Sequence, residues 1–244
     1  MAKLTDFKVL TFDCYGTLID WESGMIEALA PLTERVDRMG RPLPRDEILA
    51  AHARQESFQQ RHTPGMRYSR LLAVVYKRLA EEWGVAASWA ECEAYGRSVR
   101  GWPAFPDSAA ALRYLKGHYA LAILSNVDNE SFQASNEKLE VAFDAIYTAE
   151  DIGSYKPAGR NFEYMLAKLG ERGFGKRDVL HVAESLYHDR APANRFRLAS
   201  CWIHRRHAEE GFGATIDPGE RPSYDFRFTS LAELVEAHQE ALRT

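Results

Sequence analysis

The sequence predicts an α/β protein built on a doubly wound parallel sheet, with a helical cap domain inserted after the first strand. Short apolar runs rich in β-branched and aromatic residues alternate with helical stretches along most of the chain. This alternation is typical of a parallel sheet that is covered by helices on both faces. The predicted strands are residues 8–13, 119–126, 178–183 and 199–204, with an edge strand at 225–229.

Helical stretches follow the predicted strands in the core. They lie at residues 108–116, 161–169 and about 188–197, with a final helix after residue 229. The first three precede the strands predicted at 119–126, 178–183 and 199–204, so that strands and helices alternate. The core therefore has the helix content of a doubly wound fold.

The insertion lies between the first and second strands. Residues 19–101 have almost no strand signal and contain four helical stretches, at 21–39, 45–60, 67–83 and 88–100, separated by glycine and proline. An insertion of this length exceeds an ordinary crossover. We therefore expect a helical cap domain at residues 18–101 and a core domain made of residues 1–17 and 102–244.

Composition narrows the classes of partner and compartment. The 244 residues carry 31 Lys and Arg against 35 Asp and Glu, a net charge of −4, which disfavours a nucleic-acid partner. No apolar run approaches the ~18 residues of a membrane span, and the N-terminus lacks the apolar region of a signal peptide. The three cysteines are widely spaced without a CxxC pair. We therefore expect a cytoplasmic protein without a membrane partner, and a symmetric homodimer on general grounds.

Reactive side chains gather where the predicted strands end. In open α/β sheets, ligands bind beyond the carboxyl ends of the strands, where the loops converge. The segments at these ends are 13–17, 125–126 and 184–189, joined by a loop at 156–157. They contribute Asp13, Thr17, Ser125, Asn126, Lys156, Glu184 and Asp189.

This set of residues fits covalent catalysis by a carboxylate. Asp13 would attack an electrophilic centre and form an ester, which water then hydrolyses. The ammonium of Lys156 would keep the nucleophile ionised and offset charge that develops in the transition state. The hydroxyls of Thr17 and Ser125, with backbone N–H groups of the turn, would hold an anionic substrate.

Four segments in order carry a family resemblance. FDCYGTLIDW, LSN, YKP and ESLYHD resemble the four motifs of the haloacid dehalogenase superfamily, and the helical insertion resembles the cap of its L-2-haloacid dehalogenase-like branch. The resemblance covers the whole chain. It implies hydrolytic dehalogenation of short 2-haloalkanoic acids through an aspartyl ester on Asp13, with no cofactor.

The resemblance also implies where the substrate binds. An arginine on the second cap helix contacts the leaving halide in this family, and Arg54 is the best match here, with Arg61 and Arg67 as the next candidates. Asn126 matches the second halide contact. Cys14 and Tyr15, in the turn after the nucleophile, complete the predicted substrate-binding residues.

Two positions distinguish the branches of the superfamily. Its phosphatases carry a second Asp that protonates the leaving alkoxide, where this chain has Tyr15. A halide leaves without a proton, so Tyr15 favours carbon–halogen chemistry. Glu184 points the other way, because phosphatases place an acid there to bind Mg²⁺; it would instead pair with Lys156 or activate water together with Asp189.

Three alternatives stay open at this stage. A Mg²⁺-dependent small-molecule phosphatase would use Asp13, Glu184 and Asp189 as metal ligands. A hydrolase of the same mechanism would open another electrophilic α-carbon, such as that of a small-ring imino acid. A binding protein without activity is disfavoured, because Asp13, Lys156 and Asp189 are retained together.

Overall fold

The computed structural model describes residues 2–243 and contains a six-stranded parallel sheet with the order β3-β2-β1-β4-β5-β6. The strands are β1 (Val9–Phe12), β2 (Ala120–Ser125), β3 (Ala145–Thr148), β4 (Val179–Ala183), β5 (Ala199–Ile203) and β6 (Phe226–Phe228). The predicted fold class is confirmed. Because β1 pairs with both β2 and β4, the residue that follows it lies at the centre of the sheet's carboxyl edge.

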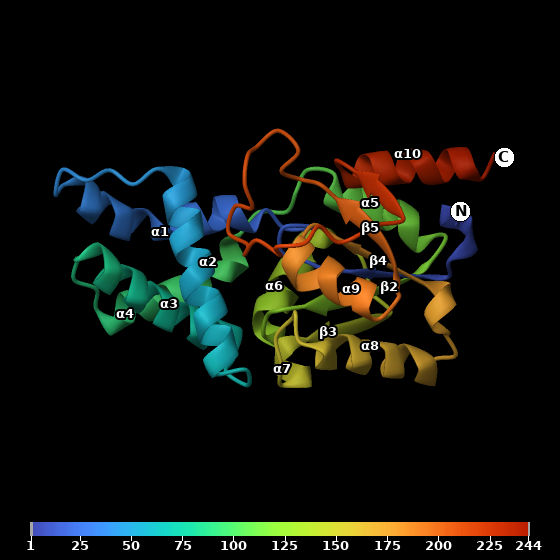
Figure 1. Cartoon of the computed structure of the whole chain (residues 1–244), viewed down its shortest axis with the longest axis horizontal. Coiled ribbons are helices and arrows are strands. Elements are labelled where there is room, and N and C mark those ends of the chain that lie inside the picture. The colour runs from blue at the N-terminus through green and yellow to red at the C-terminus, as the bar shows by residue number, and fades with distance from the viewer. Residues whose placement is uncertain (1, 244) are drawn as a thin grey trace.

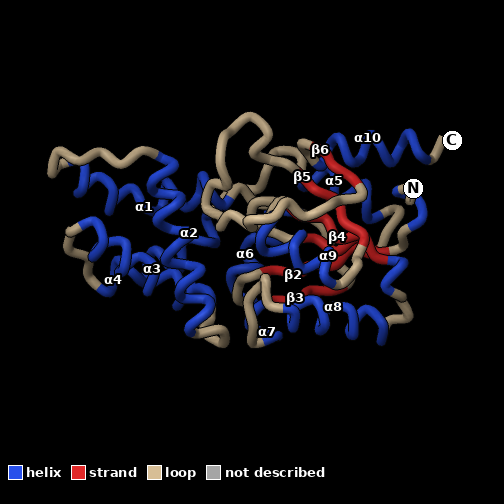
Figure 2. The backbone as a smooth tube through the Cα atoms, in the orientation of Figure 1, coloured by secondary structure: helices blue, strands red, loops and turns tan. Residues whose placement is uncertain are grey.

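Helices cover both faces of the sheet (Figures 1 and 2). Side chains alternate along a strand, so Leu10 and Phe12 of β1 pack in one apolar cluster and Val9 packs in the other. The first face is covered by α5 (Ser108–Lys116), α6 (Asn129–Leu139) and α10 (Leu231–Ala241). The second is covered by α7 (Ala149–Ile152), α8 (Gly159–Glu171) and α9 (Ala191–Arg195).

Four helices between β1 and β2 gather at the opposite end of the molecule (Figure 1). We call them the helical bundle: α1 (Trp21–Asp37), α2 (Arg45–His62), α3 (Tyr68–Trp83) and α4 (Trp89–Arg97). Asp20 accepts a hydrogen bond from the N–H of Ser23 at the start of α1, and Ser88 forms a capping box with Glu91 at the start of α4. The division into two domains at the boundaries given above stays a prediction.

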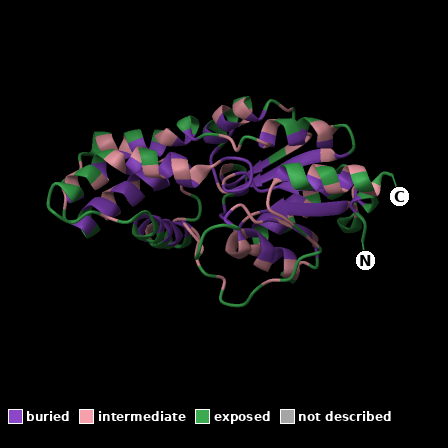
Figure 3. Cartoon of the chain, turned by 90° about the horizontal axis from the view of Figure 1, so that it is seen from above, coloured by how far each residue is buried: buried purple, intermediate pink, exposed green. Residues whose placement is uncertain are grey.

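Buried residues are concentrated in the sheet and on the inner faces of the bundle helices (Figure 3). The central strands β1, β2 and β4 are almost entirely buried, while each bundle helix has one buried and one exposed face. On α3, for example, Leu71, Val75 and Leu79 are fully buried. Their spacing of four residues places them on one face, which is why the helix is amphipathic. No helix of the described chain is long and apolar enough to cross a membrane.

Several elements differ from the prediction. The edge strand β3 and the helix α6 were not predicted, because β3 has only four residues, of which Ala145 and Ile146 are partly exposed. The helix expected at about 188–197 is a π-helical turn, Leu186–Arg190, followed by the short α9. These segments lack the long periodic pattern on which a sequence-based assignment depends.

The loop from His204 to Asp225, between β5 and β6, reaches from the core to the bundle (Figure 1). Glu22 of α1 accepts a hydrogen bond from the N–H of Ala214 at 2.8 Å and pairs with the buried Arg206. Gly213 has a φ of +59°, and a Cβ there would lie 1.8 Å from Glu22 Oε1. This loop is therefore tied to the first bundle helix by one buried carboxylate.

Candidate active site

Asp13 follows β1 at the centre of the carboxyl edge of the sheet. Its side chain is 6% exposed, and its Oδ2 accepts a hydrogen bond from the hydroxyl of Thr17 at 2.8 Å. That hydroxyl in turn accepts the backbone N–H of Glu184 at 2.9 Å. Gly16, with a φ of +92°, allows the tight turn that brings the hydroxyl of Thr17 back to Asp13. The turn therefore fixes one oxygen of Asp13.

Lys156 fixes the other oxygen. Its buried ammonium donates to Asp13 Oδ1 at 2.7 Å, to Asp189 Oδ1 at 2.7 Å and to the carbonyl of Leu124 at 2.9 Å. Asn126 positions the lysine backbone, accepting its N–H at 2.7 Å and donating to its carbonyl at 3.0 Å. The side-chain amide of Asn126 is therefore largely engaged in holding the loop.

The charges of this cluster are coupled. Burial alone would lower the pKa of Lys156, but Asp13 and Asp189 outweigh it and hold that pKa above its usual range. Burial raises the pKa of Asp13, and the adjacent Lys156 opposes this shift and favours the ionised carboxylate. Burial also opposes ionisation of Asp189, yet Lys156 and His181 lower its pKa to about 2. Asp189 is therefore a permanent anion beneath the site.

His181 and Thr11 support Asp189 from inside the core. His181 Nε2 lies 2.9 Å from Asp189 Oδ1, and the Thr11 hydroxyl lies 2.8 Å from His181 Nδ1. Because an ionised carboxylate only accepts, Nε2 of His181 carries the proton of this contact and donates it to Asp189. The sequence analysis missed both residues, which lie within predicted strands.

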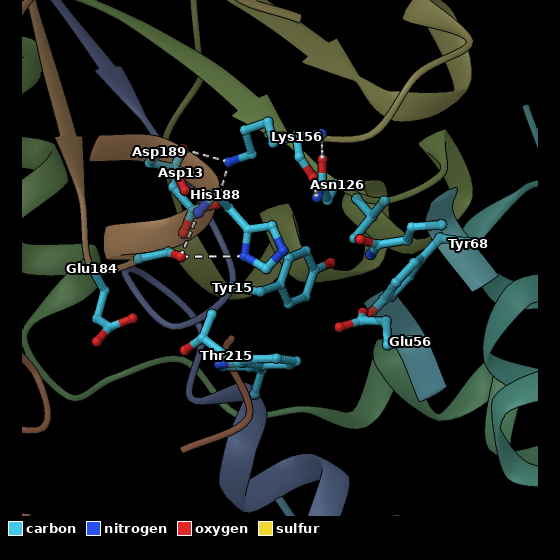
Figure 4. Close-up of a pocket in the computed structure, with 14 residues that line it drawn as sticks. Asp13, Tyr15, Glu56, Tyr68, Asn126, Lys156, Glu184, His188, Asp189 and Thr215 are labelled. Carbon is cyan, nitrogen blue, oxygen red and sulfur yellow. Dashed lines mark hydrogen bonds and ion pairs between the residues drawn. The ribbon is translucent and has the colours of Figure 1, made fainter. Parts of the chain in front are cut away.

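A pocket of about 460 Å³ opens above this cluster, between the sheet edge and the bundle (Figure 4). The described residues that line it come from three parts of the chain. The core contributes Asp13, Tyr15, Asn126, Val127, Lys156, Glu184, Ser185, His188 and Asp189; the bundle contributes Trp21, Glu56, Gln60 and Tyr68; the loop between β5 and β6 contributes Thr215.

The structure brings together most of the predicted site residues, but not all. Thr17 contacts Asp13 without lining the pocket. Cys14 and Ser125 do not line it either: Cys14 is fully buried in the apolar cluster of the first sheet face, and Ser125 is 2% exposed. Their predicted substrate contacts do not agree with this geometry, because alternate residues of an extended segment point to opposite sides.

Arg54 is the clearest correction. It lies on the outer face of α2, with a side chain that is 57% exposed, and forms an ion pair with Glu82 at 2.7 Å. Arg67 is also on the surface and pairs with Glu150, and Arg61 is exposed. The α2 side chains that line the pocket are Glu56 and Gln60. No arginine is among the described residues that line it.

Tyr15 enters the pocket as a neutral hydroxyl. Its oxygen lies 2.8 Å from Ser135 Oγ, and its ring packs edge-on against Trp102. Burial raises the pKa of Tyr15 well above its usual value. It therefore does not replace the carboxylic acid that a phosphate ester requires for its leaving group.

Three further titratable groups line the pocket, and the sequence analysis assigned a role only to Glu184. Burial, with Glu22 and Asp13 nearby, raises the pKa of Glu184 to about 8. Burial raises the pKa of Glu56 to about 7 and lowers that of His188 to about 4. At pH 7, Glu184 is therefore mostly protonated and His188 is neutral. Nε2 of His188 is buried and has no partner in the described chain.

The acids do not fit a Mg²⁺ site. Lys156 Nζ binds both Asp13 Oδ1 and Asp189 Oδ1, and Glu184 forms no ion pair with Lys156 (Figure 4). Within residues 2–243, no group of three or more His, Cys, Asp or Glu residues is arranged to hold a metal ion. The cation that organises these carboxylates is the lysine.

The fold and the buried Asp13–Lys156–Asp189 arrangement define the chain as an α/β enzyme with a carboxylate at the end of its central strand. The chain belongs to the haloacid dehalogenase-like hydrolases, because the model of that family matches residues 7–194. The family resemblance inferred from the four motifs is therefore confirmed.

Individual relatives agree with this family. An (S)-2-haloacid dehalogenase of Pseudomonas putida is 32% identical over 133 residues, which cover 53% of this chain and 54% of the relative. A pyrimidine 5′-nucleotidase of Escherichia coli is 26% identical over 44% of this chain and 48% of its own length. The chain thus spans about half the length of the curated relatives it matches. The crystal structure of the L-2-haloacid dehalogenase PA0810 shares the fold, with a TM-score of 0.76 and 22% identity over 96% of this chain and 99% of that one.

Proposed function

We propose that this protein hydrolyses 2-haloalkanoic acids, with Asp13 as a nucleophile that forms an ester with the α-carbon. The observation that carries the proposal is the geometry of Asp13. It lies at the end of the central strand, faces the pocket, and has each carboxylate oxygen held by one donor, from Lys156 and Thr17. The (S)-2-haloacid dehalogenase among the relatives supports the substrate class.

In the first step, one oxygen of Asp13 attacks the α-carbon in line with the carbon–halogen bond. The halide leaves with the bonding electron pair, and an ester links Asp13 to the substrate. Tyr15, in place of a carboxylic acid, suits a leaving group that needs no proton. Gln60 and the remaining amide proton of Asn126 are the polar groups we assign to the departing halide.

In the second step, water attacks the carbonyl carbon of the ester. The ammonium of Lys156 offsets the negative charge on the tetrahedral intermediate. We assign proton acceptance from water to His188, because it is neutral at pH 7 and its buried Nε2 has no partner in the described chain. Glu184 already carries a proton at that pH, so it is a poor base. The ester opens to the 2-hydroxy acid, and Asp13 is restored.

A single-turnover experiment in ¹⁸O-enriched water tests the mechanism. With enzyme in excess over (S)-2-chloropropanoate, the hydroxy acid should be unlabelled and Asp13 should carry the label, as read by mass spectrometry of the product and of the peptide. Under multiple turnovers the product should become labelled. A labelled first-turnover product would show that water attacks the substrate directly.

The substitution Asp13→Asn is a second test of the covalent mechanism. The amide keeps the size of the side chain but is a far weaker nucleophile, so halide release should fall at least about a thousandfold. Asp37→Asn, at the exposed end of α1, is the matched control and should retain full activity. Near-normal turnover by Asp13→Asn, with deamidation excluded by mass, would refute the covalent mechanism.

A further inference from the structure

The wall of the pocket opposite Asp13 is built by the bundle and carries a buried carboxyl group. Glu56 of α2 is 5% exposed, and its Oε1 accepts a hydrogen bond from the hydroxyl of Tyr68 at 2.7 Å. Glu56 and Tyr68 lie across the pocket from Asp13 and Lys156 (Figure 4). Tyr15 lies between these two sides of the pocket. The face of α2 that meets the pocket thus carries an acid, and the arginine expected there, Arg54, lies on the outer face.

Positive charge is scarce on this wall. Lys156 is the one Lys or Arg among the described residues that line the pocket, and its ammonium is bound by Asp13 and Asp189. The titratable groups packed around Glu56 are phenols: Tyr68 of α3, Tyr95 of α4 and Tyr155 before α8. Burial raises the pKa of Glu56 to about 7, opposed only by the hydrogen bond from Tyr68, and no cation is among the causes of the shift.

A buried carboxyl group is costly unless donors satisfy both of its oxygens. Tyr68 satisfies Oε1, and no hydrogen bond to Oε2 exists within the described chain. A second anion at this wall would be repelled by Glu56 once it ionises. A ligand ammonium would instead give a charge-assisted hydrogen bond in a desolvated site, where such a bond is strongest.

We propose that the substrate carries a basic nitrogen whose ammonium group binds Glu56, so that the preferred substrates are amino-substituted 2-haloalkanoic acids. This inference rests on the proposed function for its reactive end, the α-carbon beside Asp13. It assigns the other end of the substrate to the bundle wall. Glu56 is thereby a specificity-determining residue that simple 2-haloalkanoates leave without a partner.

Turnover of matched substrate pairs tests the inference. Halide release from 4-amino-2-chlorobutanoate is compared with that from 2-chloropentanoate, which has nearly the same shape without the charge, and spontaneous halide loss is subtracted. The wild-type kcat/KM should be at least about tenfold higher for 4-amino-2-chlorobutanoate than for 2-chloropentanoate. Glu56→Gln still accepts the Tyr68 hydrogen bond and should lose most of this preference. Glu47→Gln, exposed on the same helix, should keep it.

Calorimetric binding of the hydroxy-acid products separates this inference from the proposed function. 4-Amino-2-hydroxybutanoate should bind the wild type more tightly than 2-hydroxypentanoate, with Glu56→Gln removing the difference. If halide is released equally from both chloro acids, and Glu56→Gln leaves their ratio unchanged, the ammonium site is wrong and the dehalogenase function stands. If no chloro acid is turned over but Glu56-dependent binding of the amino acid persists, the function is wrong and the site stands.

Discussion

His181 Nε2 lies 2.9 Å from Asp189 Oδ1, so a buried histidine that does not line the pocket contacts a carboxylate that does. This contact belongs to a buried series of polar groups that runs from Thr11 through His181 to Asp189 and Lys156 and ends at Asp13. Because Asp189 binds the ammonium of Lys156, which also contacts Asp13, an interior histidine supports the position of a group that lines the pocket.

His181→Ala should therefore impair both stability and catalysis. Removing a buried, hydrogen-bonded ring leaves Asp189 with one donor fewer and creates a cavity, which should lower the free energy of unfolding by on the order of 3 kcal/mol. Thr11→Val, which removes only the outer hydrogen bond, should cost about 1 kcal/mol. Urea unfolding and kcat are the measurements, with His118→Ala on the surface as the control. Unchanged kcat in His181→Ala would show that Asp189 is held without it.

Arg54→Ala should leave kcat and KM within about twofold of the wild type, because Arg54 lies outside the pocket and pairs with Glu82 on the surface. The exposed ion pair should contribute less than about 1 kcal/mol to stability. Steady-state kinetics and thermal unfolding check both values. A loss of halide release as large as a hundredfold would mean that Arg54 reaches the pocket during catalysis.

His188→Gln should separate the two chemical steps. Attack by Asp13 does not need a base, so the ester should still form, while its hydrolysis should slow about a hundredfold. Intact-protein mass spectrometry should then detect the ester adduct on most of the enzyme. Tyr187→Phe, beside it but outside the pocket lining, should accumulate no adduct. Fast turnover of His188→Gln without adduct would remove His188 from the mechanism.

Stability should depend on Glu184 in the neutral to alkaline range. The pKa of Glu184 rises from 4.5 to about 8 on folding, so the folded state binds more protons than the unfolded state between these values. The free energy of unfolding must therefore fall as pH rises through this window. Between pH 5 and pH 9, the wild type should lose on the order of 3 kcal/mol more than Glu184→Gln. Urea unfolding measures the free energy at both pH values, and the exposed Glu163→Gln is the control, which should lose as much as the wild type. An equal loss in the wild type and in Glu184→Gln would contradict the raised pKa of Glu184.

Complete removal of divalent metal should leave activity within about twofold of its starting value. The reason is electrostatic: the buried ammonium of Lys156 already pairs with one carboxylate oxygen of Asp13 and one of Asp189. Halide release is measured after dialysis against EDTA, with added Mg²⁺ as the comparison. Abolished activity that Mg²⁺ restores would favour the phosphatase alternative.

The sequence patterns were sufficient to predict the parallel sheet and the residues that lie at its carboxyl edge. Asp13, Lys156, Glu184 and Asp189 could be placed together because the ends of parallel strands meet at one edge whatever the detailed packing. The edge strand β3 escaped prediction because it is short and half exposed. His181 escaped because it reads as an ordinary strand residue until the register pairs it with Thr11 of β1.

The bundle wall could not be predicted, because it depends on helical phase. Arg54 and Glu56 are two residues apart, which separates their directions by about 200° around a helix. Glu56 and Gln60 are four apart and share a face. The family resemblance indicated Arg54 from its place on the second predicted bundle helix. Tertiary packing sets which face of α2 meets the core, and the sequence of one helix does not encode that packing.

The contact of Glu22 with the loop that carries Thr215 bears on how family members can be recombined. If the helical bundle were replaced by that of a relative, Glu22 would be replaced with it. Its contacts Gly213, Ala214 and Arg206 would remain, because they belong to the core. A chimaera that receives the bundle of a relative keeps this pocket wall only if position 22 still offers a carboxylate. The wall of this pocket thus depends jointly on two segments nearly 200 residues apart in the sequence.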